Sequence, residues 1–588
     1  MALALEVERS VSGRRWRPRA CDPAIALAIG QRLDLPEIVA RVLAGRGVTV
    51  ETAPAFLAPR LRQWLPDPSH LRDLDVAAAR LADAVATGEV IGLLADYDVD
   101  GATSAALVAR YLGAVGARFA LDIPDRLAEG YGPNRHALER LAAQGCRLVV
   151  TLDSGTTAFE ALAAAGELGQ EVIVVDHHVA EPRLPPAIAV VNPNRCDQDS
   201  PVGELAAVGV TFLVVVALNR LLRARGHFAS RPEPDLRQWL DLVALGTVCD
   251  LVPLTGLNRA LVAQGLKVAA RQGNPGLGAL AAVARCAGSP TADHFGFLLG
   301  PRLNAGGRTG ASRLGAELLA SDLPDVVREL AMELERLNEQ RRTLERQLTT
   351  AAEAQIATAL ATDAPLLLAA AEGWSPGVLG LVASRLVERH HRPAVVIGLA
   401  DGIGKGSGRS VPGFDLGRAV IAARQEGLLI QGGGHPMAAG LTVAADRLEA
   451  LGAFLTERLA RECGPGAPPP PDLSLDGALE VSAVSPGLAA RLEHLAPFGR
   501  GNPEPRFMLP EVRVWQVRRV GDGHLDCWLA DRVGGRVRGI AFRALDRPLG
   551  KALLETAGAP LHVAGRIKLD HWQGTARVSL QIEDAALA

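Results

Sequence analysis

An acidic loop between a buried strand and a helix constrains this chain more than any other stretch. The apolar run Val90–Ala95 predicts a buried strand of a parallel sheet. The sequence Asp96-Tyr97-Asp98-Val99-Asp100-Gly101 follows it and leads into a segment of helical character. Three carboxylates at alternate positions of such a loop repel one another unless a cation lies among them. A solvated acidic turn is the alternative, and the recurrence of the pattern along the chain argues against it.

The same arrangement recurs twice more along the predicted sheet. In an open parallel sheet, ligands bind beyond the carboxyl ends of the strands, so polar residues at those ends are expected to converge on one crevice. The apolar segment 240–248 leads to Asp250, which is a further candidate. The other two strands and the residues that follow them are 147–152 with Asp153-Ser154-Gly155, and Glu171–Val175 with Asp176-His177-His178.

Five or six carboxylates with one or two imidazoles in one crevice predict a site for divalent cations, with two ions expected. Oxygen ligands with a minority of histidine suit Mn²⁺ or Mg²⁺ better than structural zinc. An aspartate that bridges two ions would hold them about 3.5–4 Å apart, where they can clamp an in-line displacement at a phosphoryl group. Helix caps or surface acids are the alternative, and they account poorly for the whole set.

Composition limits the class of protein. A chain of 588 residues that is 48% hydrophobic and 22% charged is typical of a soluble protein of three or four domains. Seven scattered cysteines without a C-x-x-C pair argue against disulfides and structural zinc. An acid at position 6 comes too early for a signal peptide, and the apolar run 206–218 is too short to span a bilayer. We therefore expect a cytoplasmic protein, and the net charge of −3 requires any nucleic-acid binding to be local.

The pattern of the chain predicts several domains. Strands and helices alternate in a first α/β domain and again in a smaller one. Leucines at three- and four-residue steps predict one long helix between them, interrupted by Arg341, with a coiled-coil dimer as the alternative. The first 70 residues are expected to pack around the domain that follows them. The predicted boundaries are 1–70, 71–320 (first α/β domain), 321–361 (helix), 362–463 (second α/β domain), 464–471 (proline-rich linker) and 472–588.

The C-terminal region predicts a small β-barrel or sandwich, with short alternating runs and a turn at Gly534-Gly535. Between residues 485 and 579 there are 15 basic and 9 acidic residues, a local excess of six positive charges (15 − 9). Aromatic side chains among arginines on a small β-domain suit single-stranded nucleic acid, and packing of the same aromatics in the core is the alternative. The aromatic residues are Phe507, Trp515, Trp528 and Trp572.

These motifs resemble the successive motifs of the DHH phosphoesterase superfamily and, more closely, those of the RecJ family of bacterial single-strand-specific 5′→3′ exonucleases. The resemblance covers roughly residues 30–588 in the family's order. It implies two α/β domains joined by a long helix and followed by an OB-like β-barrel. Besides the acidic loop and residues 153–155 and 176–178, it rests on 123–126, 129–132, 244–250, 301–308, 406–410, 432–435 and 496–503.

The resemblance implies a role for each matching residue. One ion would be held by Asp98 and Asp153, with Asp153 bridging to the second ion. The second ion would be completed by Asp100, His177 and Asp250. The residues implied to orient ligands or to meet the scissile phosphate are Asp96, Asp176 and His178. Substrate phosphates, including a 5′-terminal phosphate, would be bound by Arg126, Arg308, Ser407 and Arg409, with His435 nearby.

Three residues depart from the family's pattern. Leu94 stands where many superfamily members carry a metal-binding histidine, so the first ion is expected to depend more on water. Ser154 replaces a commoner cysteine. Ser375 stands where a histidine is usual, which affects the expected substrate contacts of the second domain and not the metal site.

The implied activity is hydrolysis of single-stranded DNA from its 5′ end to nucleoside 5′-monophosphates, in DNA repair and recombination. The implied partners are a single-strand-binding protein and a helicase, and a monomer is expected. Two other functions stay open. A phosphodiesterase of short oligonucleotides or cyclic dinucleotides would not need the basic β-domain, and a non-catalytic DNA-binding scaffold would not need intact metal ligands.

Overall fold

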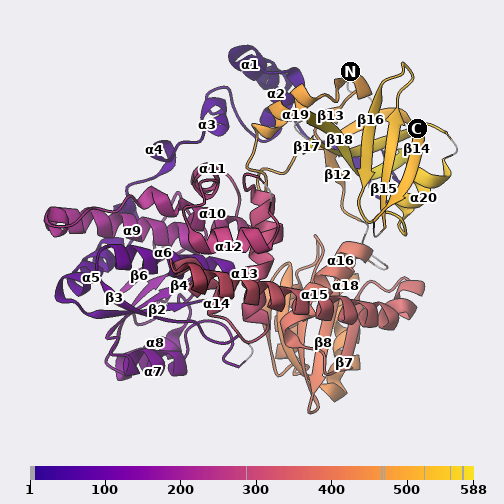
Figure 1. Cartoon of the computed structure of the whole chain (residues 1–588). Coiled ribbons are helices and arrows are strands. Elements are labelled where there is room, and N and C mark those ends of the chain that lie inside the picture. Colours follow the sequence, from indigo (N-terminus) through magenta and orange to yellow (C-terminus); the bar gives the residue numbers. More distant parts are fainter. Residues whose placement is uncertain are drawn as a thin grey trace.

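Two α/β units, a long helix between them and a β-barrel make up the molecule (Figure 1). This arrangement confirms the fold class expected from the sequence. The computed structural model describes residues 7–588 except 127, 287, 465, 467, 469, 522, 557, 573 and 574, and except the side chains of residues 570–576.

The first sheet is wholly parallel, and both of its faces are covered by helices. One face packs on α5 (Leu74–Thr87), α6 (Val99–Ala114) and α9 (Ala207–Ala224), and the other on α7 (Arg135–Ala143) and α8 (Phe159–Glu167). Burial on both faces explains why the strands are continuous apolar runs. In spatial order the strands are β3 (Arg118–Asp122), β2 (Val90–Ala95), β4 (Leu148–Leu152), β5 (Glu171–Val175) and β6 (Ala189–Val191).

Helix α9 is longer than the apolar run expected from the sequence. By length and composition its 18 residues could cross a membrane, with a mean hydropathy of 1.7, yet 72% of the segment is buried inside the protein. It packs against α5, α6 and α10 (Leu240–Cys249), so it is a core helix of the first unit. Since the segment before Asp250 is the helix α10, Asp250 reaches the crevice from the C-terminal end of a helix.

Several further helices complete the first unit and lead to the long helix α15 (Pro324–Ala361). Arg341 interrupts the leucine stripe of α15, and at this position polar side chains connect the helix to the second unit. Arg341 donates to Glu345 Oε2 (2.8 Å) and to Asn338 Oδ1 (2.9 Å), and Arg385 of α16 (Pro376–His390) donates to Glu345 Oε1 (2.9 Å). The preceding helices are η2 (His227–Ala229), η3 (Leu236–Trp239), α11 (Gly256–Ala269), α12 (Pro275–Val283), η4 (His294–Leu299), α13 (Gly300–Arg308) and α14 (Leu314–Ala320).

The second unit has a mixed sheet, in which β7 and β8 are parallel and the other pairs are antiparallel. Helices α16, α17 (Leu416–Gln425) and α18 (Leu448–Cys463) cover it, and η5 (Ala445–Arg447) precedes α18. In spatial order its strands are β10 (Gln431–His435), β11 (Ala438–Ala444), β9 (Ile403–Arg409), β8 (Ala394–Ala400) and β7 (Leu367–Glu372).

The C-terminal strands close into a barrel, because β14 pairs with both β15 and β17. The turn at Gly534-Gly535 joins β15 to β16, as predicted. The short elements around the barrel are β13 (Gly477–Ala478), η6 (Val481–Ala483), α19 (Pro486–Glu493) and α20 (Pro548–Glu555). The barrel strands are β14 (Phe507–Val520), β15 (His524–Ala530), β16 (Arg536–Ala541), β18 (Thr575–Leu587) and β17 (Leu561–Trp572).

The N-terminal segment packs mainly on this barrel, so the expectation that it surrounds the first α/β domain was wrong for most of its length. Strand β1 (Trp16–Pro18) pairs with β12 (Leu473–Leu475), and Trp16 Nε1 donates to Asp584 Oδ2 (3.0 Å). The sequence shows that these residues are apolar and not which surface they cover. Helices α1 (Pro23–Leu33), α2 (Glu37–Ala44) and α3 (Ala53–Leu57) share the barrel's core, while α4 (Leu61–Trp64) and η1 (Pro68–His70) reach the first unit.

Asp241 in α10 makes stability depend on pH. It is fully buried, its Oδ1 accepts from the backbone N–H of Leu242 (2.8 Å), and its Oδ2 has no hydrogen-bond partner among the described residues. Burial raises its pKa to about 6, so the folded state binds the proton more tightly than the unfolded state and stability falls as pH rises through this range. We therefore compare the free energy of unfolding of Asp241→Asn with that of the wild type. This difference should shift in favour of the variant by about 1–2 kcal/mol from pH 5 to pH 8. Urea denaturation at both pH values measures it, and an unchanged difference would contradict it.

Candidate metal centre and phosphate site

The turn after β2 places three carboxylates at the carboxyl edge of the first sheet. Asp98 is the N-cap of α6, and its Oδ1 accepts from the backbone N–H groups of Asp100 (2.9 Å) and Gly101 (3.0 Å). Asp96 and Asp100 lie on either side of it and are buried. Gly101 permits the tight turn, because a Cβ there would lie 2.3 Å from the carbonyl oxygen of Asp96. Local backbone geometry therefore holds the three acids together.

The neighbouring strands and α10 bring further ligand atoms to the same edge. His177 Nε2 lies 3.3 Å from Asp153 Oδ1 and 3.7 Å from Asp250 Oδ2. Because Asp153 and His177 each belong to two sets of potential ligands, adjacent cation positions would share them. The three sets, in each of which the ligand atoms lie within 4.8 Å of one another, are Asp96, Asp98 and Asp153; Asp100, His177 and Asp250; and Asp153, His177 and His178.

Unpartnered buried atoms show that the cluster fits a divalent cation. Oδ1 of Asp96, Oδ1 of Asp153, Nε2 of His177 and Oδ2 of Asp250 are buried and have no hydrogen-bond partner among the described residues. Leaving such atoms unpaired costs about 1–3 kcal/mol each, and a cation would be their partner. His177 Nδ1 lies 3.1 Å from the carbonyl oxygen of Leu205, so the proton belongs on Nδ1 and the lone pair of Nε2 faces the cluster.

The acids of the cluster have raised pKa values. Burial, reinforced by the neighbouring carboxylates, raises the pKa of Asp96, Asp100 and Asp153 well above the usual range. Burial and then the charge of Asp98 raise the pKa of Asp250 to about 7. Crowded carboxylates of this kind hold protons that a divalent cation displaces.

Asp176 and His178 form a separate pair beside these ligands. Asp176 Oδ1 lies 2.8 Å from His178 Nδ1 and accepts from the backbone N–H of His177 (2.7 Å). Burial alone would raise the pKa of Asp176, but the hydrogen bond from His178 and donors from Thr156 lower it well below its usual range. Burial lowers the pKa of His178, but the hydrogen bond to Asp176 and the charge of that carboxylate raise it more. The pKa of His178 is therefore raised to about 9. The pair therefore presents a fixed imidazolium to the cluster.

Two asparagines that were not predicted from the sequence hold this loop. Asn192 Nδ2 donates to Thr156 Oγ1 (2.8 Å) and to the carbonyl of His178 (2.8 Å), and Asn194 Nδ2 donates to the carbonyl of His177 (2.5 Å). Both asparagines follow β6, the fifth strand of the sheet. The rule that polar residues at strand ends converge would have identified them, had this short strand been recognised.

Arginines from both α/β units meet at the junction between them. Arg308 at the end of α13 donates to the carbonyl of Gly377 on α16 (2.9 Å), and Arg126 stacks 4.9 Å from the ring centroid of Tyr97. Burial, followed by the charges of Arg126, Arg341 and Arg409, lowers the pKa of Arg308 to about 10. Within the described part of the chain, Arg126, Arg308 and Arg409 have no carboxylate within ion-pair distance. Positive charges gathered in this way form a site for an anion such as phosphate.

The remaining predicted residues of the second unit lie on β9, on β10 and at the start of α16. Arg409 on β9 donates to Ser407 Oγ (3.0 Å), so these two predicted residues lie together. His435 ends the edge strand β10, and β11 separates it from Arg409. Ser375 is the N-cap of α16. Leu94 is buried in the core between the sheet, α7 and α8.

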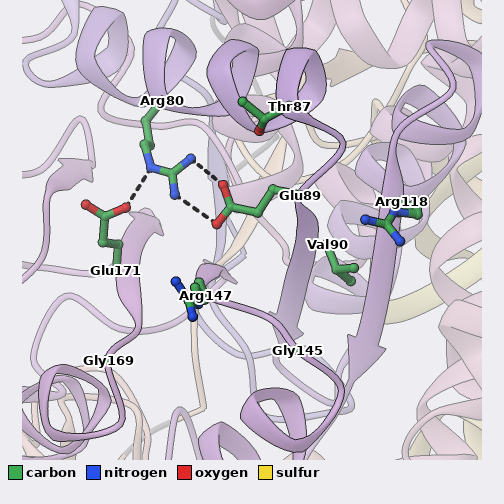
Figure 2. Close-up of a pocket in the computed structure, with 9 residues that line it drawn as sticks. All are labelled: Arg80, Thr87, Glu89, Val90, Arg118, Gly145, Arg147, Gly169 and Glu171. Atoms are coloured by element: carbon green, nitrogen blue, oxygen red, sulfur yellow. Dashed lines mark hydrogen bonds and ion pairs between the residues drawn. The ribbon is translucent and has the colours of Figure 1, made fainter.

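A cavity of about 620 Å³ lies at the opposite, amino-terminal edge of the same sheet (Figure 2). Its carboxylates are already paired, since Arg80 contacts Glu89 (2.9 Å) and Glu171 (2.7 Å). Arg118 and Arg147 line the same cavity. The acidic cluster lies at the other ends of these strands, so this cavity is not part of the candidate metal centre.

Models of three protein families match successive parts of the chain. The DHH family, N-terminal domain, matches residues 90–247, the DHHA1 domain matches 363–461, and the RecJ OB domain matches 475–584. These three stretches contain the first sheet, the second sheet and the barrel.

Curated relatives and solved structures match nearly the whole chain. The single-stranded-DNA-specific exonuclease RecJ of Bacillus subtilis is 32% identical over 98% of this chain and 71% of its own length. The protein of the same description from Escherichia coli is 36% identical over 87% of this chain and 89% of its own. The crystal structure of RecJ in complex with Mn²⁺ from Thermus thermophilus covers 97% of this chain and 79% of its own, with a TM-score of 0.81 and 30% identity. The chain belongs to the RecJ family of single-stranded-DNA-specific exonucleases.

Proposed function

We propose that this protein hydrolyses single-stranded DNA from its 5′ end and releases nucleoside 5′-monophosphates, in DNA repair and recombination. The observation that carries the proposal is the placement of two unlike sites side by side. A cluster of unpartnered carboxylate and imidazole atoms lies next to arginines that lack carboxylate partners among the described residues. The first suits divalent cations, and the second suits the terminal phosphate of a strand whose next phosphodiester lies in the cluster.

The residues proposed to hold two Mn²⁺ or Mg²⁺ ions are Asp98, Asp153, Asp100, His177 and Asp250, with Asp96 as a further oxygen donor. Such cations activate water and stabilise charge on phosphate oxygens. Residues of the chain bind the substrate and position it. The arginine cluster binds and orients the strand, and Asp176 holds the His178 imidazolium where it can offset charge on the scissile phosphate.

The barrel supports a role in guiding the strand. Trp515 and Trp528 are 57% and 39% exposed, and the guanidinium of Arg536 lies 4.1 Å from the ring centroid of Trp515. Exposed aromatic rings beside arginines suit stacking of unpaired bases. Phe507 is fully buried and belongs to the core, and the side chain of Trp572 lies outside the described residues.

We infer the cellular setting from the same chemistry. An exonuclease confined to single strands needs another protein to expose them, which supports a helicase and a single-strand-binding protein as partners. The proposed substrate, single-stranded DNA, supports a cytoplasmic location, where the DNA of a bacterial cell lies. The leucine face of α15 is used within the chain, where Leu334, Leu337 and Leu348 are buried, and this supports a monomer.

The test compares digestion of 5′-labelled and 3′-labelled single strands in Mn²⁺, with a duplex as control. We expect the 5′ label to be released first as mononucleotide, and the duplex to survive. Release of the 3′ label first would overturn the polarity. Turnover of dinucleotides alone would favour the small-substrate phosphodiesterase, and removal of residues 472–588 would then leave the rate unchanged. Absence of Mn²⁺ binding in calorimetry would favour a scaffold.

A further inference from the structure

The loop that opens the barrel domain lies directly on the segment after Asp250. The backbone N–H of Leu254 donates to the carbonyl of Arg500 (2.7 Å). A Cβ on Gly501, whose φ is +77°, would lie 3.0 Å from Thr255 and 3.2 Å from Pro253. The barrel domain therefore contacts, through residues 499–502, the segment that follows the proposed ligand Asp250.

Two side chains, Arg259 and Asn502, fix the position of this loop. Arg259 on α11 is buried and donates to the carbonyls of Leu495 (2.9 Å), Ala496 (2.8 Å) and Pro497 (3.1 Å). Asn502 Nδ2 donates to the carbonyls of Leu495 and Pro497, both at 2.9 Å. Because these contacts involve backbone atoms and other side chains, the position of the loop does not depend on the side chain of Arg500.

The side chain of Arg500 is available to a ligand. It is exposed, and its Nη1 lies 3.4 Å from the carbonyl oxygen of Leu251, a long hydrogen bond. Within the described part of the chain, its guanidinium has no carboxylate within ion-pair distance. Leu251 directly follows the proposed ligand Asp250, so this contact places the guanidinium beside the Asp250 end of the cluster.

Arg500 and the arginine cluster stand at different ends of the metal centre. Arg126 stacks on Tyr97, the residue between Asp96 and Asp98, whereas Arg500 contacts the carbonyl of Leu251, the residue after Asp250. A strand with its 5′-terminal phosphate in the arginine cluster and its first phosphodiester among the carboxylates would continue toward the Asp250 end. There the next phosphate of the strand meets Arg500.

We propose that Arg500 binds the phosphate on the 3′ side of the scissile phosphodiester, so that the barrel domain contributes a substrate contact at the metal centre itself. The inference rests on the proposed function and adds a specific residue to it. A guanidinium with one long hydrogen bond to a carbonyl and no carboxylate partner among the described residues is suited to a pair of phosphodiester oxygens. Substrates that lack this phosphate gain nothing from Arg500.

The experiment compares Arg500→Gln with Arg491→Gln, a control that removes an exposed arginine of α19 in the same domain. A 5′-phosphorylated dinucleotide has no phosphate beyond the scissile one, and a 20-nucleotide strand has many. For Arg500→Gln we expect KM on the long strand to rise about tenfold with little change in kcat, and both constants on the dinucleotide to stay at the wild-type value. The slope of log KM against log[salt] on the long strand should fall by about 0.7, the value for one phosphate contact on a single strand. Arg500→Lys should recover part of the loss.

Two outcomes would overturn the inference while the proposed function stands. In one, Arg500→Gln matches Arg491→Gln on the long strand. In the other, it loses activity equally on both substrates, which would place Arg500 on the scissile phosphate. If the unchanged protein digests neither substrate, the proposed function itself is overturned.

Discussion

Asp153→Asn is expected to lower the Mn²⁺-dependent exonuclease rate by about 10³-fold or more while the protein stays folded. Asp153 belongs to two of the three ligand sets, so losing its charge weakens both proposed cation positions. An asparagine has the same shape and tolerates the left-handed backbone of this position, where φ is 63°. The substitution also removes one of several crowded, buried carboxylates, so no loss of stability is expected.

Thermal unfolding with and without Mn²⁺ separates loss of metal binding from loss of structure. Mn²⁺ at 100 times its Kd should stabilise the wild-type protein by about 2.7 kcal/mol and should stabilise Asp153→Asn much less. Asp241→Asn serves as the matched control, because it removes a buried carboxylate outside the cluster and should keep full activity. Activity of Asp153→Asn within tenfold of wild type would show that Asp153 is not a shared ligand.

Arg259→Met is expected to destabilise the protein by about 3 kcal/mol. Arg259 is buried, and it donates to the carbonyls of Leu495, Ala496 and Pro497 and to that of Phe56 (2.9 Å), whose ring it also contacts at 3.8 Å. Methionine fills similar space without donors. Asn502 still donates to the carbonyls of Leu495 and Pro497, so those of Ala496 and Phe56 lose their donor, at about 1–3 kcal/mol each. Burial lowers the pKa of Arg259 to about 10, so it stays charged at neutral pH, and these carbonyls are what stabilise the charge.

Urea denaturation, followed at the first unfolding transition, measures this effect. Arg259→Lys keeps a charge but fewer donors, so an intermediate loss is expected. The control is Arg237→Met, which removes an exposed arginine paired with Asp235 and should change stability by less than about 1 kcal/mol. An equal effect of the two methionine variants would show that Arg259 does not fasten the barrel loop and the N-terminal segment to the first unit.

The sequence by itself determined the parts of this protein that depend on local pattern. A buried parallel strand is a continuous apolar run, and ligand-binding residues directly follow its last residue. Asp96, Asp153 and Asp176 could therefore be predicted to lie at one edge of a sheet. The stripe of leucines likewise predicted the long helix. The acid after α10 was found because its segment is equally apolar, although that segment is a helix.

Only the tertiary structure decided which distant segments meet. Apolar residues near the N-terminus could cover any surface, and they cover the barrel made by the other end of the chain. In the sequence, Arg341 only interrupts a row of leucines. In the structure it belongs to a hydrogen-bonded group with Glu345 and Arg385. Arg259 and Arg500 carry no local signal, because their partners are backbone carbonyls and charges hundreds of residues away. Local periodicity follows from one strand or helix, whereas these contacts follow from the packing of whole domains, which no short stretch of sequence contains.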